Sequence, residues 1–266
     1  MTRLQLLVPG AVEIGDLATH RGDTLAALAD LYAYPDPLPA EGWVRASMVS
    51  TVDGAAAGAD GLSKSIGNEV DRAILSTLRG LADVVLVGAG TVRAERYAVP
   101  VPKPEFAEQR ARRGMAPVPV MAVVSRSGSL SGAVADLFAA PGRAILVTTR
   151  TVDTTALRAR LGEQSVVVAG ERDVDVHAAV AALSDRGLRR VLLEGGPSLL
   201  GAALAQGRVD EICQTVSPLA VAGQAPRIAH GPAAEARLRL AHLVVGGSTL
   251  LGRWLVHSPG SGPVNV

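Results

Sequence analysis

The chain contains a single cysteine, Cys213, among its 266 residues. One cysteine excludes an intrachain disulfide framework and a zinc site built from cysteines. Because Cys213 lies in an apolar run, we expect a buried structural thiol. The histidines show no metal-ligand spacing and share no motif, so no metal site is predicted; they are His20, His177, His230, His242 and His257.

Long apolar runs and tracts of one charge are also missing. No stretch approaches the roughly 18 apolar residues that a membrane span needs. Only a short apolar run follows Met1-Thr2-Arg3, so no signal peptide is predicted and we expect a cytoplasmic protein. The net charge is +1 and no basic tract stands out, which argues against a dedicated nucleic-acid binder. A small molecule is the expected partner, with neither nucleic acid nor membrane.

Apolar residues make up 48% of the chain, but aromatic residues only 3%. Abundant Ala, Val, Leu and Gly suit a buried parallel sheet covered by helices. From Trp43 onward, apolar runs alternate with helical patterns, which predicts βαβ units and a mostly parallel sheet. No good helix lies between the last two predicted strands, so we expect an antiparallel C-terminal edge. The predicted strands are 43–49, 84–87, 118–124, 144–148, 165–168, 191–193, 212–216 and 249–256. The predicted helices are 70–81 with Asn68 as N-cap, 155–161, 176–184 and 198–206.

The remaining segments interrupt this alternation. Residues 1–42 are interpreted as a lead-in packed on the main domain, with a helix capped by Asp23 that ends near Tyr32. Residues 43–257 form the main domain. Residues 100–117, which contain four prolines and three arginines, are predicted to form an exposed loop, and residues 258–266 a flexible tail.

A glycine turn, Leu193-Glu194-Gly195-Gly196-Pro197, ends one buried strand and starts a helix. Backbone N–H groups at a helix N-terminus attract anions, and glycine lets a phosphate approach the backbone closely. Pro197 suits the first helical turn because its missing donor costs nothing there. An ordinary strand-to-helix turn explains the same pattern. An acid at the end of an apolar strand, as Glu194 is, faces a site more often than a core.

Two further motifs follow strands. Gly88-Ala89-Gly90-Thr91-Val92-Arg93 resembles a dinucleotide fingerprint but has Arg93 in place of the third glycine. Two glycine turns at strand ends suggest one ligand across the carboxyl edge of a sheet. Ser50-Thr51-Val52-Asp53-Gly54 ends another strand and leads into a run of small and polar residues that could fold over a ligand. An Asp-Gly pair is equally typical of a plain turn.

Together these motifs resemble the pyrimidine reductase family of riboflavin biosynthesis, which has the dihydrofolate reductase fold. The resemblance runs from about Arg45 to Leu255. It rests on Ser50–Gly54, Ile66-Gly67, Val87–Val92, the 193–199 turn and 209–218, in that order. It implies a three-layer α/β domain with helices on both faces of the sheet. It also implies a homodimer, as family members often pair through sheet edges, and the 212–216 strand is apolar enough to take part.

The resemblance implies hydride transfer from NADPH to C1′ of a ribosylaminopyrimidine phosphate. Glu194 is the first candidate for polarisation or proton transfer, and Asp53, in the same pocket, is the second. Arg126 matches a cofactor position, where a guanidinium could pair with the 2′-phosphate of NADPH. Ser63, Arg79 and Glu194 would contact substrate. The other implied cofactor contacts are Val49, Thr51, Ser65, Thr91, Glu95, Gly195, Gly196, Pro197, Ser198, Leu199 and Leu200.

The substrate side departs from the family pattern. Ser47 replaces a frequent lysine, and Ala55 a common basic residue. Family members usually carry an acidic-Pro stretch at this point, with an arginine further on that binds the substrate phosphate. This chain reads Glu95-Arg96-Tyr97-Ala98-Val99-Pro100 instead, and Arg96 and Arg93 are the candidates to substitute. The H-x-E and P-C-x-x-C motifs of the family's zinc-dependent deaminase domain are not in the sequence. Two alternatives therefore stay open: a dihydrofolate or pterin reductase, and a cofactor-binding protein that has lost catalysis.

Overall fold

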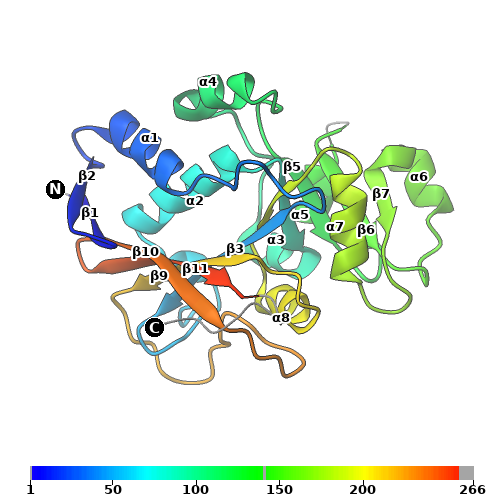
Figure 1. Ribbon diagram of the computed structural model, residues 1–266. Helices are drawn as coiled ribbons and strands as arrows, with labels where there is room; N and C mark the ends of the chain where they lie inside the picture. Colours follow the sequence, from blue (N-terminus) through cyan, green and yellow to red (C-terminus); the bar gives the residue numbers. More distant parts are fainter. Residues whose placement is uncertain (1, 140–141, 258–266) are drawn as a thin grey trace.

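The computed structural model describes residues 2–139 and 142–257. They form an eleven-stranded sheet with the strand order β2-β1-β10-β11-β9-β3-β8-β4-β5-β6-β7 (Figure 1). The strands are β1 (Arg3–Val8), β2 (Val12–Asp16), β3 (Trp43–Thr51), β4 (Val84–Gly88), β5 (Val120–Val124), β6 (Ala144–Thr148), β7 (Val166–Val168), β8 (Arg190–Leu193), β9 (Glu211–Ser217), β10 (Leu238–Gly246) and β11 (Thr249–Val256). The helices are α1 (Arg21–Leu31), α2 (Glu69–Leu81), α3 (Ala89–Glu95), α4 (Pro104–Arg112), α5 (Ala133–Leu137), α6 (Thr155–Leu161), α7 (Val176–Ser184) and α8 (Pro197–Ala205), with short 3₁₀ turns η1 (Ser63–Ser65) and η2 (Glu163–Ser165).

The sheet has a parallel part and an antiparallel part. Strands β9, β3, β8, β4, β5, β6 and β7 are parallel neighbours, which confirms the α/β class and the mostly parallel sheet. Strand β11 pairs antiparallel with β9, as predicted. The outermost strand at this end is the N-terminal β2, however, because β1 pairs with β10 and buries Leu4. The predicted antiparallel end is therefore present, but its outermost strand comes from the N-terminal and not the C-terminal part of the chain. Residues 3–16 belong to the same sheet.

Side chains alternate between two apolar cores, one on each face of the sheet. On β4, Val85 and Val87 pack on the side of α1 to α5, whereas Val84 and Leu86 pack on the side of α7 and α8. Strands that are buried on both faces need continuous apolar runs, which explains why the sequence shows them. This arrangement confirms the three-layer architecture with helices on both faces.

The predicted helices are all present, as α1, α2, α6, α7 and α8. Asn68 caps α2 by accepting a hydrogen bond from the Asp71 amide at 3.1 Å. The predicted cap of α1 is wrong: His20 is the N-cap, and Asp23 lies in the first turn, where a carboxylate also favours the helix dipole. The expected tail at 258–266 lies outside the described residues. No helix in the described part of the chain is long and apolar enough to cross a membrane; the cytoplasmic location stays a prediction.

The 100–117 segment contains helix α4 and is not only the exposed loop that we expected. Pro104 occupies its first turn, where proline is tolerated, and Phe106 is buried against Gly80 of α2. One turn later, the Arg110 guanidinium donates to the carbonyls of Gly80 at 3.0 Å and Ala82 at 2.8 Å. Arg110 thus satisfies the carbonyl groups left free at the C-terminus of α2.

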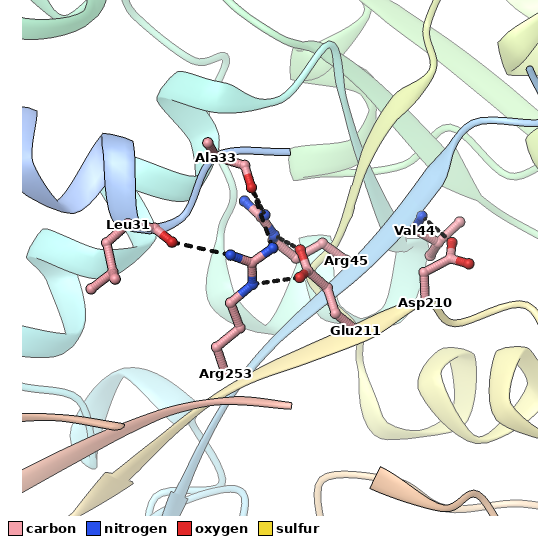
Figure 2. A network of polar contacts seen from close by, with 7 residues as sticks. All are labelled: Leu31, Ala33, Val44, Arg45, Asp210, Glu211 and Arg253. Atoms are coloured by element: carbon pink, nitrogen blue, oxygen red, sulfur yellow. Dashed lines mark hydrogen bonds and ion pairs between the residues drawn. The ribbon is translucent and has the colours of Figure 1, made fainter. Parts of the chain in front are cut away.

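A buried ion-pair network lies where the parallel and antiparallel parts of the sheet meet, on β3, β9 and β11 (Figure 2). Glu211 of β9 accepts from Arg45 of β3 and, at 2.6 Å, from Nε of Arg253 of β11. Arg253 also donates to the Leu31 and Ala33 carbonyl oxygens at 3.0 and 3.2 Å. The side chains of Arg45 and Glu211 are fully buried. The network therefore ties the end of α1 to three strands.

Candidate active site

A cavity of about 600 Å³ opens at the carboxyl ends of β3, β4 and β8. Its walls come from these strand ends, the loop at 56–67, one face of α2 and the end of α3. The carboxyl edge of parallel strands is where α/β proteins bind ligands. Its volume lies within the usual range of small-molecule sites.

The two glycine turns meet at this edge. The Gly88 amide donates to the Gly195 carbonyl oxygen at 2.8 Å, so the turn after β4 lies against the turn after β8. A Cβ on Gly196 would lie 2.5 Å from the Thr91 hydroxyl oxygen. Gly195 has a φ of +87°, a conformation that favours glycine. Glycine is therefore favoured at 195 by its backbone conformation and at 196 by the closeness of the Thr91 hydroxyl.

Glu194 forms the polar centre of the cavity. Nε and Nη2 of Arg79, on α2, donate to its two carboxylate oxygens at 2.6 Å each, and the Tyr97 hydroxyl donates to Oε2 at 2.8 Å. The Glu194 side chain is only 2% exposed. The Arg79 guanidinium also lies 5.3 Å from the centre of the Tyr97 ring. A bidentate arginine–carboxylate pair of this kind holds both side chains in a fixed geometry.

The electrostatics of this group keep its donors protonated. Burial alone would lower the pKa of Arg79, but the Glu194 carboxylate beside it raises the pKa above its ordinary value. Burial raises the pKa of Tyr97 well above its ordinary value, and the charge of Glu194 raises it further. Tyr97 therefore stays a neutral hydroxyl donor, and Glu194 acts as the acceptor of the group.

The loop that could cover a ligand is held near the cavity by Glu95 of α3. Its Oε1 accepts from the Ser63 amide at 2.6 Å, so η1 lies against the end of α3. Ser63 and Glu95 both line the cavity. The Ser65 hydroxyl, by contrast, contacts Asp60 at 2.7 Å within the loop and does not line the cavity.

Asp53 lies away from the cavity wall. Its carboxylate accepts from the Thr51 hydroxyl and from the amides of Val221 and Ala222, the latter at 2.6 Å. The Thr51 hydroxyl and these amides lower the pKa of Asp53. A carboxyl group with a lowered pKa is a poor proton donor near neutral pH. The structure therefore does not support Asp53 as a pocket residue or a catalytic acid; it fixes the loop after β9.

Eight of the predicted contacts line the cavity: Val49, Ser63, Arg79, Thr91, Glu95, Glu194, Gly196 and Pro197. Others do not. Gly195 lies behind the wall, Ser198 is exposed, and Leu199 and Leu200 pack into the core. Only backbone groups of these two leucines could therefore contact a cofactor. Thr51 is buried and its hydroxyl accepts from the Ala55 amide at 2.9 Å.

Arg126 also lies outside this cavity, just beyond the end of β5. Its Nη1 pairs with Asp173 at 2.9 Å, and both side chains are more than 70% exposed. Exposed pairs of this kind contribute little stability. An anion can therefore replace Asp173 at low cost.

The sequence patterns did not predict four polar side chains on the cavity wall: Lys64, Asp71, Arg72 and Tyr97. Helical spacing could have predicted Arg72 as a cavity residue, because it shares one face of α2 with Leu75 and Arg79. Tyr97 had none in the local pattern, since its contact with Glu194 joins residues 97 positions apart.

Comparison with known families identifies the chain. Residues 42–251 match the RibD C-terminal domain model. The chain belongs to this family. The match confirms the resemblance found in the sequence, over nearly the same residues.

Several RibD-type relatives are similar over most of their length. One is the 2,5-diamino-6-ribosylamino-4(3H)-pyrimidinone 5′-phosphate reductase of Archaeoglobus fulgidus, 28% identical over 190 residues, which cover 71% of this chain and 86% of the relative. The reductase of the same name from Methanothermobacter thermautotrophicus is 31% identical over 185 residues, or 66% of this chain and 78% of that one. A pyrimidine reductase-like protein from Corynebacterium diphtheriae has a solved structure with a TM-score of 0.74 and 26% identity, covering 87% of this chain and 99% of that one.

Proposed function

We propose that this RibD-type chain is an NADPH-dependent reductase that transfers hydride to a ribosylaminopyrimidine phosphate. The names of the archaeal relatives support the substrate class. The observation that carries the proposal is the position of the Glu194–Arg79–Tyr97 group. It shares one cavity with Thr91 and Gly196 of the two glycine turns. A reductase needs a substrate-binding group and a cofactor-binding group in one cavity, because the substrate must lie beside the cofactor.

The residues of the two turns fit a dinucleotide. A Cβ at Gly196 would clash with the Thr91 hydroxyl, so this backbone carries no side chain, and helix α8 begins directly after it. A helix N-terminus of this kind can hold a pyrophosphate. Val49, Thr91 and Glu95 line the adjoining wall. When bound, the nicotinamide supplies the hydride, and the chain holds donor and acceptor carbons at contact distance.

Glu194 would bind and polarise the substrate. A carboxylate has about four acceptor positions, of which Arg79 and Tyr97 use three. The remaining position, on Oε1, can accept an N–H of an aminopyrimidine. Because the Glu194 side chain is nearly inaccessible to water, this hydrogen bond is strengthened by its surroundings. Tyr97 and Arg79 are positioning residues that keep the carboxylate aimed at the substrate.

The cofactor assignment predicts selective stabilisation by NADPH. At 100 times its Kd, a ligand adds about 2.7 kcal/mol to the free energy of unfolding. We expect NADPH to raise the melting temperature more than NADH does at equal concentration. Arg126→Ala should abolish this difference by weakening NADPH binding about 10-fold. Differential scanning fluorimetry measures both.

Arg150→Ala is the matched control. Arg150 is a similarly exposed arginine that pairs with Glu171 at 3.1 Å, and its replacement should leave the preference intact. If neither nucleotide stabilises the protein, the proposed function is wrong. If Arg126→Ala weakens NADPH and NADH equally, the assignment of Arg126 to the 2′-phosphate is wrong.

Substrate turnover separates the reductase from its alternatives. NADPH absorbance should fall with the ribosylaminopyrimidine phosphate and stay constant with dihydrofolate. Turnover of dihydrofolate alone would favour a folate reductase. Stabilisation by NADPH without turnover of either compound would favour a cofactor-binding protein that has lost catalysis.

We also propose a homodimer. The expected contact through the edge of the 212–216 strand is wrong, because β9 lies between β11 and β3 inside the sheet. Support comes instead from exposed leucines on the antiparallel strands β1, β10 and β11: Leu7, Leu238 and Leu250 are each 41% exposed. Light scattering should give twice the chain mass of 27.2 kDa, and Leu250→Glu should give monomers. A wild-type monomer would contradict the proposal.

A further inference from the structure

Three cations on the cavity wall have no carboxylate partner among the residues that the structure describes. They are Lys64 of η1, Arg72 of α2 and Arg96 at the end of α3. Within residues 2–139 and 142–257, none of them forms an ion pair. Arg79, on the same wall, is already paired with Glu194. The cavity therefore keeps positive charge that its own residues do not neutralise.

The carboxylates of the wall are already engaged. Glu194 accepts from Arg79 and Tyr97, and Glu95 accepts from the Ser63 amide. Burial raises the pKa of Asp71, against a hydrogen bond from Thr215 and the charge of Arg72. Asp71 is therefore engaged by Thr215 as well. Among the described residues, neither Lys64 nor Arg72 forms an ion pair with any of these carboxylates.

Lys64 and Arg72 flank one short segment of backbone. A Cβ on Gly67 would lie 2.8 Å from Oδ2 of Asp71 and 3.7 Å from the Lys64 carbonyl oxygen. The end of η1 therefore packs closely on the first turn of α2. Arg72 shares the cavity-facing side of α2 with Leu75 and Arg79, so it lies about two turns from the Glu194 group. This separation, roughly 10 Å along the helix, suits a pentose between a ring at Glu194 and a phosphate at Arg72.

The next arginine along the chain cannot take this role. Beyond Arg96, the first arginine is Arg110. Its guanidinium donates to the carbonyl oxygens of Gly80, Ala82 and Ala116. The whole residue is only 3% exposed. It caps α2 and does not reach the cavity wall. The stretch that departs from the family pattern therefore supplies no phosphate-binding arginine of its own beyond Arg96.

We propose that Lys64 and Arg72 form the subsite for the phosphate monoester of the substrate. The proposal rests on the proposed reductase function for the identity of the substrate, but the cations and their geometry do not depend on it. Lysine supplies a point charge and arginine a planar fork, and both are suited to phosphate. The phosphate would lie at the mouth of the cavity, two turns of α2 away from Glu194. Arg96, at the end of α3, lines the same cavity.

The test compares D-ribose 5-phosphate with D-ribose by isothermal titration calorimetry. The wild-type protein should bind only the phosphorylated sugar. Lys64→Met and Arg72→Met should each weaken this binding about 10-fold or more, the usual effect of losing one charged hydrogen bond. Arg93→Met is the matched control. Arg93 lies on α3 but lines a neighbouring hollow, with Gly132 and Asp136, and not this cavity.

Each result decides the proposal. A loss in Arg93→Met with none in Lys64→Met and Arg72→Met would place the phosphate in the neighbouring hollow and overturn it. Equal binding of ribose and ribose 5-phosphate, or binding of neither, would overturn it too. Selective binding that both variants lose would support the subsite even if the protein turned over no pyrimidine. Conversely, turnover with an unchanged KM in both variants would leave the reductase function intact and refute the subsite.

Discussion

Replacing Glu211 by glutamine is expected to lower the free energy of unfolding by about 3–5 kcal/mol. Glutamine keeps the size of the side chain but removes the negative charge between Arg45 and Arg253. Arg45 is fully buried, so its charge would lie in the interior with no counter-charge. Breaking a buried pair in this way is costly because the remaining ion has lost its hydration. Chemical denaturation in urea measures the effect.

Two controls separate this effect from a general loss of charge. Glu163→Gln breaks the pair with Arg158, but Glu163 is 71% exposed, so the expected loss is below about 1 kcal/mol. Arg253→Met leaves the Arg45–Glu211 pair in place, and it should cost less than Glu211→Gln. A loss within about 1 kcal/mol for Glu211→Gln would show that the buried charge of Arg45 is tolerated alone.

The pH dependence of Glu211→Gln follows from the same contacts. Burial acts to raise the pKa of Glu211, but Arg45 and Arg253 lower it below its ordinary value of 4.5. A carboxyl group with a lower pKa in the folded state stabilises the fold above its unfolded-state pKa. This contribution is lost as the pH falls through the folded-state pKa. The difference between the wild-type protein and Glu211→Gln should therefore be full above about pH 4.5 and shrink in stronger acid.

The parallel part of the fold could be predicted because its signals are local. Strands such as β4 and β6 are buried on both faces and show continuous apolar runs. The glycine turns could be found for a similar reason, since a close backbone approach requires glycine at that position. Strands β1 and β2 are mostly exposed on their outer face and carry Arg3, Gln5 and Glu13. Their place in the sheet depends on pairing with β10, more than 200 residues away in the chain.

Which polar groups of the interior pair with one another could not be predicted. Arg45 and Glu211 are 166 residues apart, and Arg79 and Glu194 are 115 apart. A sequence shows each charge but not its partner. A charged residue within an apolar run is therefore interpreted as part of an edge strand or a turn. Asp53 shows the reverse case. Its motif suggested a pocket residue, yet backbone amides of a loop 168 residues further along engage its carboxylate.

Replacing Glu194 by glutamine is expected to reduce turnover by about 100-fold or more, the usual effect of removing a polarising or proton-transferring group. Glutamine has a single acceptor oxygen and places an NH₂ group against either Arg79 or Tyr97. The ion pair with Arg79, which fixes the side chain, is then lost. The acceptor position for the substrate is lost with it. NADPH affinity should change little, because the glycine turns and the α8 N-terminus do not use this carboxylate. Steady-state kinetics and fluorimetry measure the two effects separately.

Asp53→Asn is the matched control for the loss of a carboxylate near the end of a strand. Because Asp53 lies off the cavity wall and binds the amides of Val221 and Ala222, this variant should lose some stability but keep its turnover within a few-fold. The turnover of Tyr97→Phe should lie between those of the two other variants. Arg79 still holds Glu194, but one of the three hydrogen bonds that Glu194 accepts is gone. Equal losses of turnover and of NADPH affinity in Glu194→Gln would contradict the role of this carboxylate. A loss in Asp53→Asn as large as that in Glu194→Gln would mean that the loop after β9 takes part in the reaction, and that the cavity wall of the free protein is incomplete.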